Sequence, residues 1–102
     1  TEEGVMINKI MVMGRISNID VSDRELKFHL TTSDRYRKNG SWIEHHDVHS
    51  IEYVGDNARQ VGESLRPGEV IHITGKSLSR KLSRGEHKYI KCYGSDLKKT
   101  GD

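Results

Sequence analysis

The chain of 102 residues and 11.7 kDa suffices for one small domain with a single hydrophobic core. Apolar residues make up 32%, and 17 basic residues face 15 acidic ones, so the net charge is only +2. No stretch approaches the roughly 20 apolar residues of a membrane span, so we expect no membrane association. The lone Cys92 excludes a disulfide-stapled secreted scaffold. We expect a reducing compartment, either the bacterial cytoplasm or an organelle matrix.

Strand periodicity dominates the first third of the chain. The apolar run from Ile10 to Met13, together with Val5 and Ile7, predicts a long first strand that is partly covered on both faces. Strict alternation of apolar and polar residues from Leu26 to Thr31 predicts a second strand with one buried face.

A hairpin and a third strand follow. Asn39-Gly40 is the strongest hairpin signal in the chain. Trp42 to Val54 is then expected to form the third strand, in which Ile51 and the interior Tyr53 share a face.

The period changes to that of a helix after residue 55. Ala58, Val61 and Leu65 form one apolar stripe of about two turns, which Asp56 or Asn57 can cap. Pro67-Gly68 ends this helix.

Two further strands are predicted, over Val70–Thr74 and Tyr89–Tyr93, with a polar, basic loop from Ser77 to His87 between them. The order of elements is strand, strand, strand, helix, strand, strand. This order is that of the five-stranded OB-fold barrel, an all-β architecture with its helix between strands 3 and 4. We therefore expect a flexible extension over residues 1–5, an OB-fold domain over 6–97 and a short tail over 98–102.

Basic residues gather in two segments, at the first hairpin and between the last two strands. Acidic residues gather instead between Glu44 and Glu69. Such segregation focuses a positive field although the net charge is small, and it indicates a polyanionic partner. Two solvated basic loops would give the same pattern.

Several segments in succession resemble bacterial and mitochondrial single-stranded-DNA-binding proteins, over about Met6 to Leu97. The segments are Asn8–Arg15, Leu30–Arg37, His49 with Ile51, Tyr53 and Gly55, Val61–Gly68, Val70–Gly75 with Leu78–Lys81, and Tyr89. The resemblance implies an OB-fold homo-oligomer, a dimer or a tetramer, that binds single-stranded DNA in replication, recombination or repair and catalyses no reaction. It implies no cofactor, and it implies the cytoplasm for a bacterial, phage or plasmid member or the matrix for a mitochondrial one.

The chain departs from this family at three stacking positions. Tyr36 retains an aromatic side chain, but Val48, Val54 and Leu82 stand where the family usually has aromatic residues. Each base–aromatic stack contributes about 1–3 kcal/mol to binding. With three stacks lost, we expect binding to depend mainly on electrostatic contacts with the phosphates. Glu52, on the same strand face as Val48 and Val54, is expected to repel phosphates.

The candidate nucleic-acid-binding residues are therefore mainly basic. Tyr36 is expected to stack on bases, whereas Trp42 fits either stacking or hydrophobic packing at the hairpin base. The basic candidates are Arg15, Arg35, Arg37, Lys38, Lys76, Arg80, Lys81, Arg84 and Lys88. The long apolar first strand and the family's third-strand histidine predict an oligomer interface at Met6, Asn8, Ile10 and His49.

Other readings of the sequence remain open. A primosome-type OB-fold adaptor, similar to primosomal protein B, would act mainly through protein partners. RNA could replace DNA, because stacking and phosphate contacts do not depend on the 2′-hydroxyl.

His45, Asp47 and His49 share a strand face and could hold a metal in a hydrolase, although we expect no metal site. Bacterial family members carry an acidic tail, and Lys98–Asp102 offers no such peptide, so we expect no tail-mediated partners.

Overall fold

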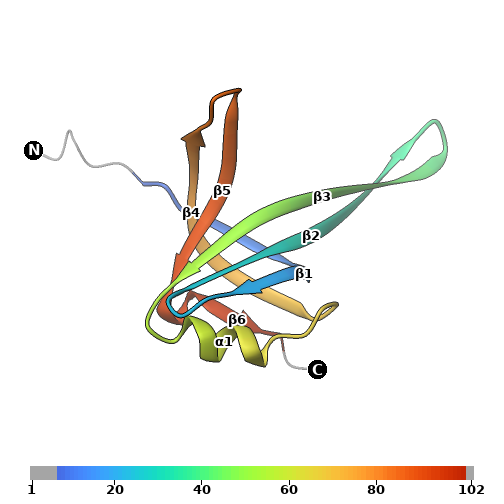
Figure 1. Ribbon diagram of the computed structural model, residues 1–102. Coiled ribbons are helices and arrows are strands. Elements are labelled where there is room, and N and C mark those ends of the chain that lie inside the picture. The colour runs from blue at the N-terminus through green and yellow to red at the C-terminus, as the bar shows by residue number, and fades with distance from the viewer. Residues whose placement is uncertain (1–6, 101–102) are drawn as a thin grey trace, which may run out of the picture.

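The computed structural model describes residues 7–100 and consists mostly of strands (Figure 1). The elements in chain order are β1 (Ile10–Val21), β2 (Glu25–Lys38), β3 (Ser41–Val54), α1 (Ala58–Ser64), β4 (Val70–Lys81), β5 (Glu86–Tyr93), the 3-10 turn η1 (Gly94–Asp96) and β6 (Leu97–Lys99). The predicted OB-fold order is confirmed, with the helix between β3 and β4. In the part of the chain that the structure describes, no helix is long and apolar enough to cross a membrane.

The first five strands close on themselves into a barrel. Antiparallel pairs join β1 to β2, β2 to β3 and β4 to β5, a parallel pair joins β3 to β5, and β1 also pairs with β4. β1 can serve two partners because its first half, up to Arg15, pairs with β4 and its second half pairs with β2. Gly14 lies at this changeover, where a Cβ atom would lie 2.5 Å from the Thr31 carbonyl oxygen. Closure thus needs a residue without a side chain there.

The barrel interior follows the alternation seen in the sequence. Leu26, Phe28 and Leu30 are buried on β2, as predicted. They pack with buried side chains of the other strands, namely Val12, Ile16, Ile51, Tyr53, Ile71, Ile73, Ile90 and Cys92. Burying such aliphatic and aromatic side chains stabilises the fold by about 1.5–3 kcal/mol each. This single core holds the sheet on which the candidate site is built.

The predicted interior position of Tyr53 is confirmed, and its hydroxyl explains a difference at the helix. The Tyr53 hydroxyl lies 3.0 Å from Asn57 Oδ1 and 2.8 Å from the Gly94 carbonyl oxygen. Asn57 precedes α1 but makes no side-chain cap bond. Asn57 therefore holds the predicted N-cap position, but its side chain accepts from the buried Tyr53 hydroxyl instead of bonding to the first turn of α1.

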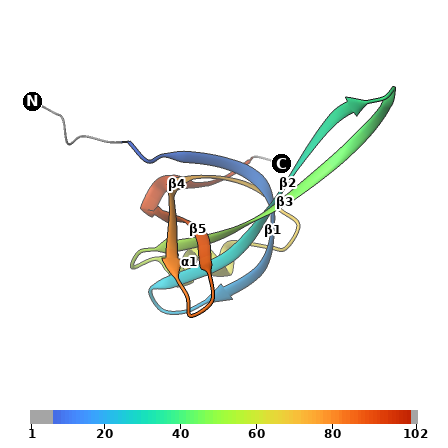
Figure 2. The ribbon, with the colours of Figure 1, turned by 90° about the horizontal axis from the view of Figure 1, so that it is seen from above.

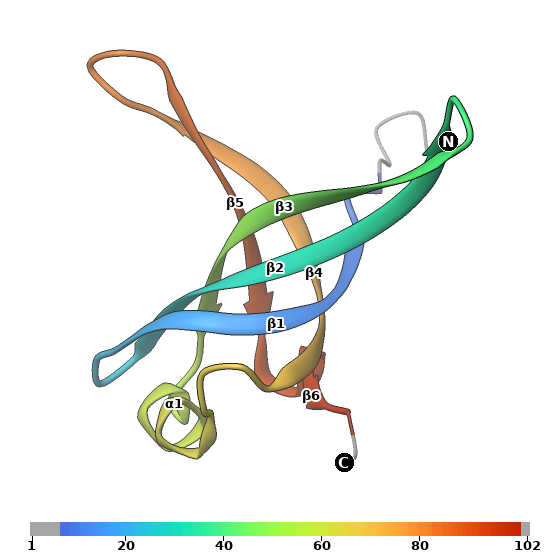
Figure 3. The ribbon, with the colours of Figure 1, turned by 90° about the vertical axis from the view of Figure 1, so that its right-hand side faces the viewer.

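Two hairpins extend beyond the barrel, and both lie at the end opposite α1 (Figures 1 and 3). We call residues 33–46 of β2 and β3 the long arm, and residues 76–91 of β4 and β5 the short arm. The long arm turns at Asn39 and Gly40, whose φ values of 52° and 81° match the two-residue hairpin predicted from Asn-Gly. Viewed from above, the long arm projects far from the closed barrel (Figure 2).

The predicted loop over residues 77–87 is wrong, because most of that segment is paired strand. β4 continues to Lys81 and β5 begins at Glu86, which leaves only residues 82–85 as the connection. The backbone ladder from Lys76 with Lys91 to Lys81 with Glu86 forms this extension. Outside the barrel neither face of the hairpin is buried in a core, so no apolar alternation marked it in the sequence.

The first strand also differs from its prediction. β1 begins at Ile10, and Ile7 precedes it with 88% of its surface exposed, whereas Val5 lies outside the described residues. Met11 and Met13 point outward and are exposed. The strand therefore begins later than predicted, and within one protomer its outward side is exposed.

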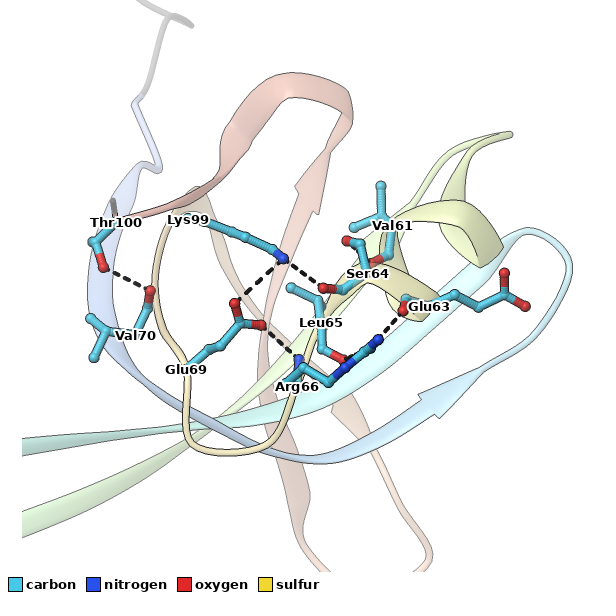
Figure 4. A network of polar contacts seen from close by, with 9 residues as sticks. All are labelled: Val61, Glu63, Ser64, Leu65, Arg66, Glu69, Val70, Lys99 and Thr100. Atoms are coloured by element: carbon cyan, nitrogen blue, oxygen red, sulfur yellow. Dashed lines mark hydrogen bonds and ion pairs between the residues drawn. The ribbon is translucent and has the colours of Figure 1, made fainter. Parts of the chain in front are cut away.

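A short sixth strand, absent from the sequence prediction, closes the end of the barrel near α1. β6 pairs with Ile71–Ile73 of β4, and it includes Lys98 and Lys99, which the sequence analysis assigned to the tail. Lys99 Nζ lies 2.5 Å from the Ser64 carbonyl oxygen and 3.4 Å from a carboxylate oxygen of Glu69 (Figure 4). The backbone N–H of Arg66 donates to Glu69 at 2.6 Å. This bond, aided by Lys99, holds the pKa of Glu69 below its usual value.

Candidate nucleic-acid interface

The outward-pointing side chains of β2, β3, β5 and β4 form a surface that we call the outer face. Alternation with buried neighbours assigns the barrel residues of this face, and cross-strand pairing extends the face to Lys76, Arg80 and His87 on the short arm. It carries Lys27, His29, Ser50, Glu52, Val54, Lys76, Arg80, His87, Tyr89, Lys91 and Tyr93. A hollow of about 230 Å³ on this face has Lys27, His29, Ser50, Glu52 and His87 among its lining residues. OB-folds commonly bind oligonucleotides on the corresponding face of strands 2 and 3.

Glu52 and Arg80 form an ion pair at the centre of the outer face. Arg80 Nη2 lies 2.9 Å from both carboxylate oxygens of Glu52, which is buried. The Arg80 guanidinium also lies over the ring of Tyr89, 4.2 Å from its centroid. Tyr89 and Glu52 both raise the pKa of Arg80. The carboxylate that we expected to repel phosphates is thus neutralised, and the cation that neutralises it is one of the expected phosphate contacts.

The long arm separates the predicted aromatic residues onto two sides. Trp42 pairs with Arg37, and the guanidinium carbons of Arg35 and Arg37 lie 5.2 and 5.5 Å from its ring centroid. Tyr36 pairs with Ile43 on the opposite side of the arm. Trp42 is 60% exposed and Tyr36 47% exposed. Trp42, Arg35 and Arg37 lie on the outer side of the arm. Tyr36 and Lys38 lie on its other side.

The short arm divides its basic residues in the same way. Arg80 lies on the outer side, opposite His87, whereas Lys81 and Lys88 alternate onto the other side. Arg84 lies in the connecting loop. Lys88 lines a second hollow of about 330 Å³, which His49 and the outer-face residue Tyr89 also line. The basic candidates of this arm therefore do not form one surface.

The two remaining basic candidates lie nearer the barrel. Lys76 pairs with Lys91 at the base of the short arm. Arg15 donates from Nη1 to the Gly68 carbonyl oxygen at 2.9 Å. Arg15 lines a hollow of about 420 Å³ between β1 and the long arm. Arg15 therefore lies between β1 and the long arm, away from the outer-face cluster at Glu52.

Tyr89 and Tyr93 are aromatic residues of the outer face that the sequence analysis did not assign to the site. Arg80 covers Tyr89, and Lys91 Nζ lies 5.7 Å from the Tyr93 ring centroid. His87 stacks with Tyr89 at 5.9 Å between centroids and 9° between planes. The alternation around Ile90 and Cys92 places both tyrosines outward, and this signal was available in the sequence.

The histidines of β3 do not form a metal centre. His45 Nε2 lies 3.2 Å from Asp47 Oδ1, whereas His49 Nε2 lies 3.1 Å from the Thr32 hydroxyl. His46 contacts Ser33 at 2.8 Å. Four residues along a strand separate His45 from His49 by about 13 Å. Within residues 7–100 no group of three potential ligands could hold a metal ion, so the structure gives no support to the metal hypothesis.

The predicted interface residues have different environments. Met6 lies outside the described residues. The Asn8 side chain donates to the Ser77 carbonyl oxygen at 2.8 Å and accepts from the Ser77 N–H at 3.0 Å. Asn8 thereby fixes the start of the chain to the short arm of the same protomer. Ile10 is half-buried and lines the hollow of about 330 Å³ that His49 also lines.

Cys92 is a core residue, as predicted. It is fully buried on β5, and this burial raises the pKa of its thiol to about 12. A thiol with such a pKa is not a nucleophile at neutral pH.

The fold is an OB-fold, a class whose members commonly bind oligonucleotides. The model of the single-strand binding protein family matches residues 7–92. The chain therefore belongs to the single-strand binding protein family, which is non-catalytic. No curated protein sequence matches the chain.

Three solved structures of single-stranded-DNA-binding proteins share the fold of the chain. A Plasmodium falciparum SSB in complex with ssDNA has a TM-score of 0.77 and 22% identity, covering 95% of this chain and 97% of its own. The small single-stranded DNA-binding protein from Streptomyces coelicolor has a TM-score of 0.67 and 14% identity, with coverages of 93% and 96%. A deletion mutant of the Thermus aquaticus single-stranded DNA binding protein has a TM-score of 0.79 and 16% identity, but this chain covers only 51% of it.

Proposed function

We propose that the protein binds single-stranded DNA without sequence preference across its outer face. The observation that carries the proposal is the repeated pairing of a cation with an aromatic ring along this face. The cations of Arg35 and Arg37 lie over the Trp42 ring. Arg80 lies over Tyr89, and Lys91 lies over Tyr93. Non-specific single-strand binding uses these two ingredients, positive charge along the backbone and rings for the bases.

The membership of the chain in the single-strand binding protein family supports the same proposal. The P. falciparum SSB with the same fold was solved in complex with ssDNA. In our proposal the strand runs from the outer side of the long arm, past Ser50 and Glu52, to the base of the short arm. Such a path leaves Tyr36 and Lys81 on the far sides of their arms, so we assign them smaller roles than Trp42.

Charge supplies much of the binding energy in this proposal. Val48, Val54 and Leu82 replace three aromatic platforms of the family, and three stacks at 1 kcal/mol each amount to about a hundredfold or more in affinity. Cations can compensate because each neutralised phosphate releases counterions. We therefore expect affinity to fall steeply as the salt concentration rises.

We also propose that the protein acts as a homo-dimer or homo-tetramer in DNA replication, recombination or repair. The first half of β1, up to Gly14, pairs with β4 on one side, and its pairing with β2 begins only at Arg15. Met11 and Met13 are exposed on the same segment. An open strand edge beside exposed apolar side chains is commonly covered by a second copy.

Fluorescence of Trp42 tests the proposed function directly, because it is the only tryptophan and is largely exposed. We expect oligo-dT to quench it with a defined site size. The log of the binding constant should fall with log salt by about 0.7 per neutralised phosphate. Oligo-U of the same length measures the preference for DNA over RNA. Absence of binding at low salt would overturn the proposal.

An adaptor that acts mainly through protein partners is the second candidate. The observation that favours it is the exposure of Val48 and Leu82, aliphatic residues at positions where the family stacks bases. Exposed aliphatic side chains contribute to protein–protein contacts more readily than to base stacking. Absence of oligonucleotide binding in the titration above would select this candidate.

A further inference from the structure

Arg80 is held on two sides at the centre of the outer face. Its Nη2 atom lies 2.9 Å from both oxygens of Glu52, and its guanidinium carbon lies 4.2 Å from the centroid of Tyr89. The Tyr89 ring is in turn stacked with His87. The guanidinium therefore has a fixed position between a buried carboxylate and an aromatic ring.

This arrangement is unsuited to phosphate binding. Glu52 is 5% exposed, and a buried carboxylate deprived of its partner is strongly unfavourable. A phosphate that drew Arg80 away would leave that carboxylate unpaired. The pair is also neutral as a unit, so Arg80 offers little net charge for releasing counterions from DNA.

The arrangement suits a planar ligand instead. Arg80 covers one face of Tyr89, so a base cannot stack directly on that face of the ring. The Arg80 side chain itself remains 43% exposed, so it is accessible to a ligand although Tyr89 covers one face of its guanidinium. Guanidinium groups are planar, are weakly hydrated compared with ammonium groups, and stack on nucleobases. Glu52 and His87 also line the adjoining hollow of about 230 Å³, which gives room for the continuing strand.

We propose that Arg80, held by Glu52 over Tyr89, is a stacking platform for a nucleobase and not a phosphate contact. The inference rests on the proposed function, because it assigns a subsite to the same single strand. It also gives Glu52 a positioning role, since Glu52 fixes the guanidinium without touching the DNA. The composite of Arg80 and Tyr89 partly replaces the aromatic platforms that Val48 and Val54 have lost.

The test compares Arg80→Lys with wild type on two ligands, oligo-dT and an abasic oligonucleotide of the same length, by fluorescence anisotropy at several salt concentrations. Lysine keeps the charge and can still pair with Glu52, but it lacks the planar guanidinium group on which a base could stack. We expect Arg80→Lys to weaken oligo-dT binding by about 5- to 150-fold, the value of one stack. Abasic binding and the salt slope should match those of wild type.

The matched control is Lys81→Gln, on the next residue and the opposite side of the hairpin. It should not reproduce the base-dependent loss: any weakening should be equal on the two ligands. Should Arg80→Lys fail to fold by circular dichroism, Glu52→Gln/Arg80→Met removes the charge pair as a unit and should give the same base-dependent loss.

Either of two results would overturn the inference: wild-type affinity of Arg80→Lys for oligo-dT, or an equal loss on abasic and oligo-dT ligands. The latter would make Arg80 a phosphate contact. Failure of the proposed function is a different result, in which wild-type protein binds neither ligand at low salt.

Discussion

Replacing Trp42 by alanine should weaken binding of oligo-dT by about 5- to 150-fold. The ring is 60% exposed and lies on the outer side of the long arm with two guanidinium groups 5.2 and 5.5 Å from its centroid. One base–aromatic stack contributes about 1–3 kcal/mol, which converts to this range. The salt slope should stay unchanged, because Arg35 and Arg37 remain on the arm. Anisotropy of a fluorescein-labelled oligonucleotide measures the affinity and the salt slope of this variant, which has no tryptophan fluorescence to follow.

Tyr36→Ala is the matched control for this prediction. Tyr36 is an exposed aromatic residue of the same arm, but it pairs with Ile43 on the other side. A strand that follows the outer face passes Trp42 and does not reach Tyr36, so Tyr36→Ala should bind almost as wild type does. A larger loss from Tyr36→Ala than from Trp42→Ala would refute the proposed path and move the strand to the other side of the long arm.

Three further predictions concern the barrel. Gly75→Ala should destabilise the fold by about 1–3 kcal/mol in urea denaturation, because a Cβ there overlaps the Lys91 carbonyl oxygen, whereas the control Ser77→Ala on the same strand should not. Glu69 has a lowered pKa when folded, so its stabilising contribution is present above its unfolded pKa near 4.5 and is lost as the pH falls through the folded value. Thermal melts of Glu69→Gln should therefore lose less stability than wild type on acidification below pH 4.5, and equal losses would contradict this. Cys92, with a pKa of about 12, should resist iodoacetamide at pH 8.5 in folded protein and react after unfolding.

Much of the fold could be predicted because its strands alternate where they face the core. The pattern over Leu26–Thr31 identified a half-buried strand, and Asn39-Gly40 identified its hairpin. The outer part of β4 and β5 escaped prediction because both of its faces are polar. β6 escaped as well, since three residues are too few to show a period.

The candidate site could be predicted in composition but not in arrangement. Basic residues at the two arms were evident in the sequence, yet their division between two sides of each arm depends on strand register. Arg35 and Tyr36 are neighbours in the chain and point in opposite directions. The pairing of Glu52 with Arg80 joins residues 28 positions apart, and no local pattern could have indicated it.

The closure near α1 has a practical consequence for single-molecule work. Thr100 donates from its backbone and its hydroxyl to the Val70 carbonyl oxygen, so the chain is held at the barrel end opposite both arms (Figures 1 and 3). A biotin or fluorophore attached at Thr100 lies at this end of the barrel. Surface tethering through that point should orient the arms toward the solution and keep the outer face free for a passing strand.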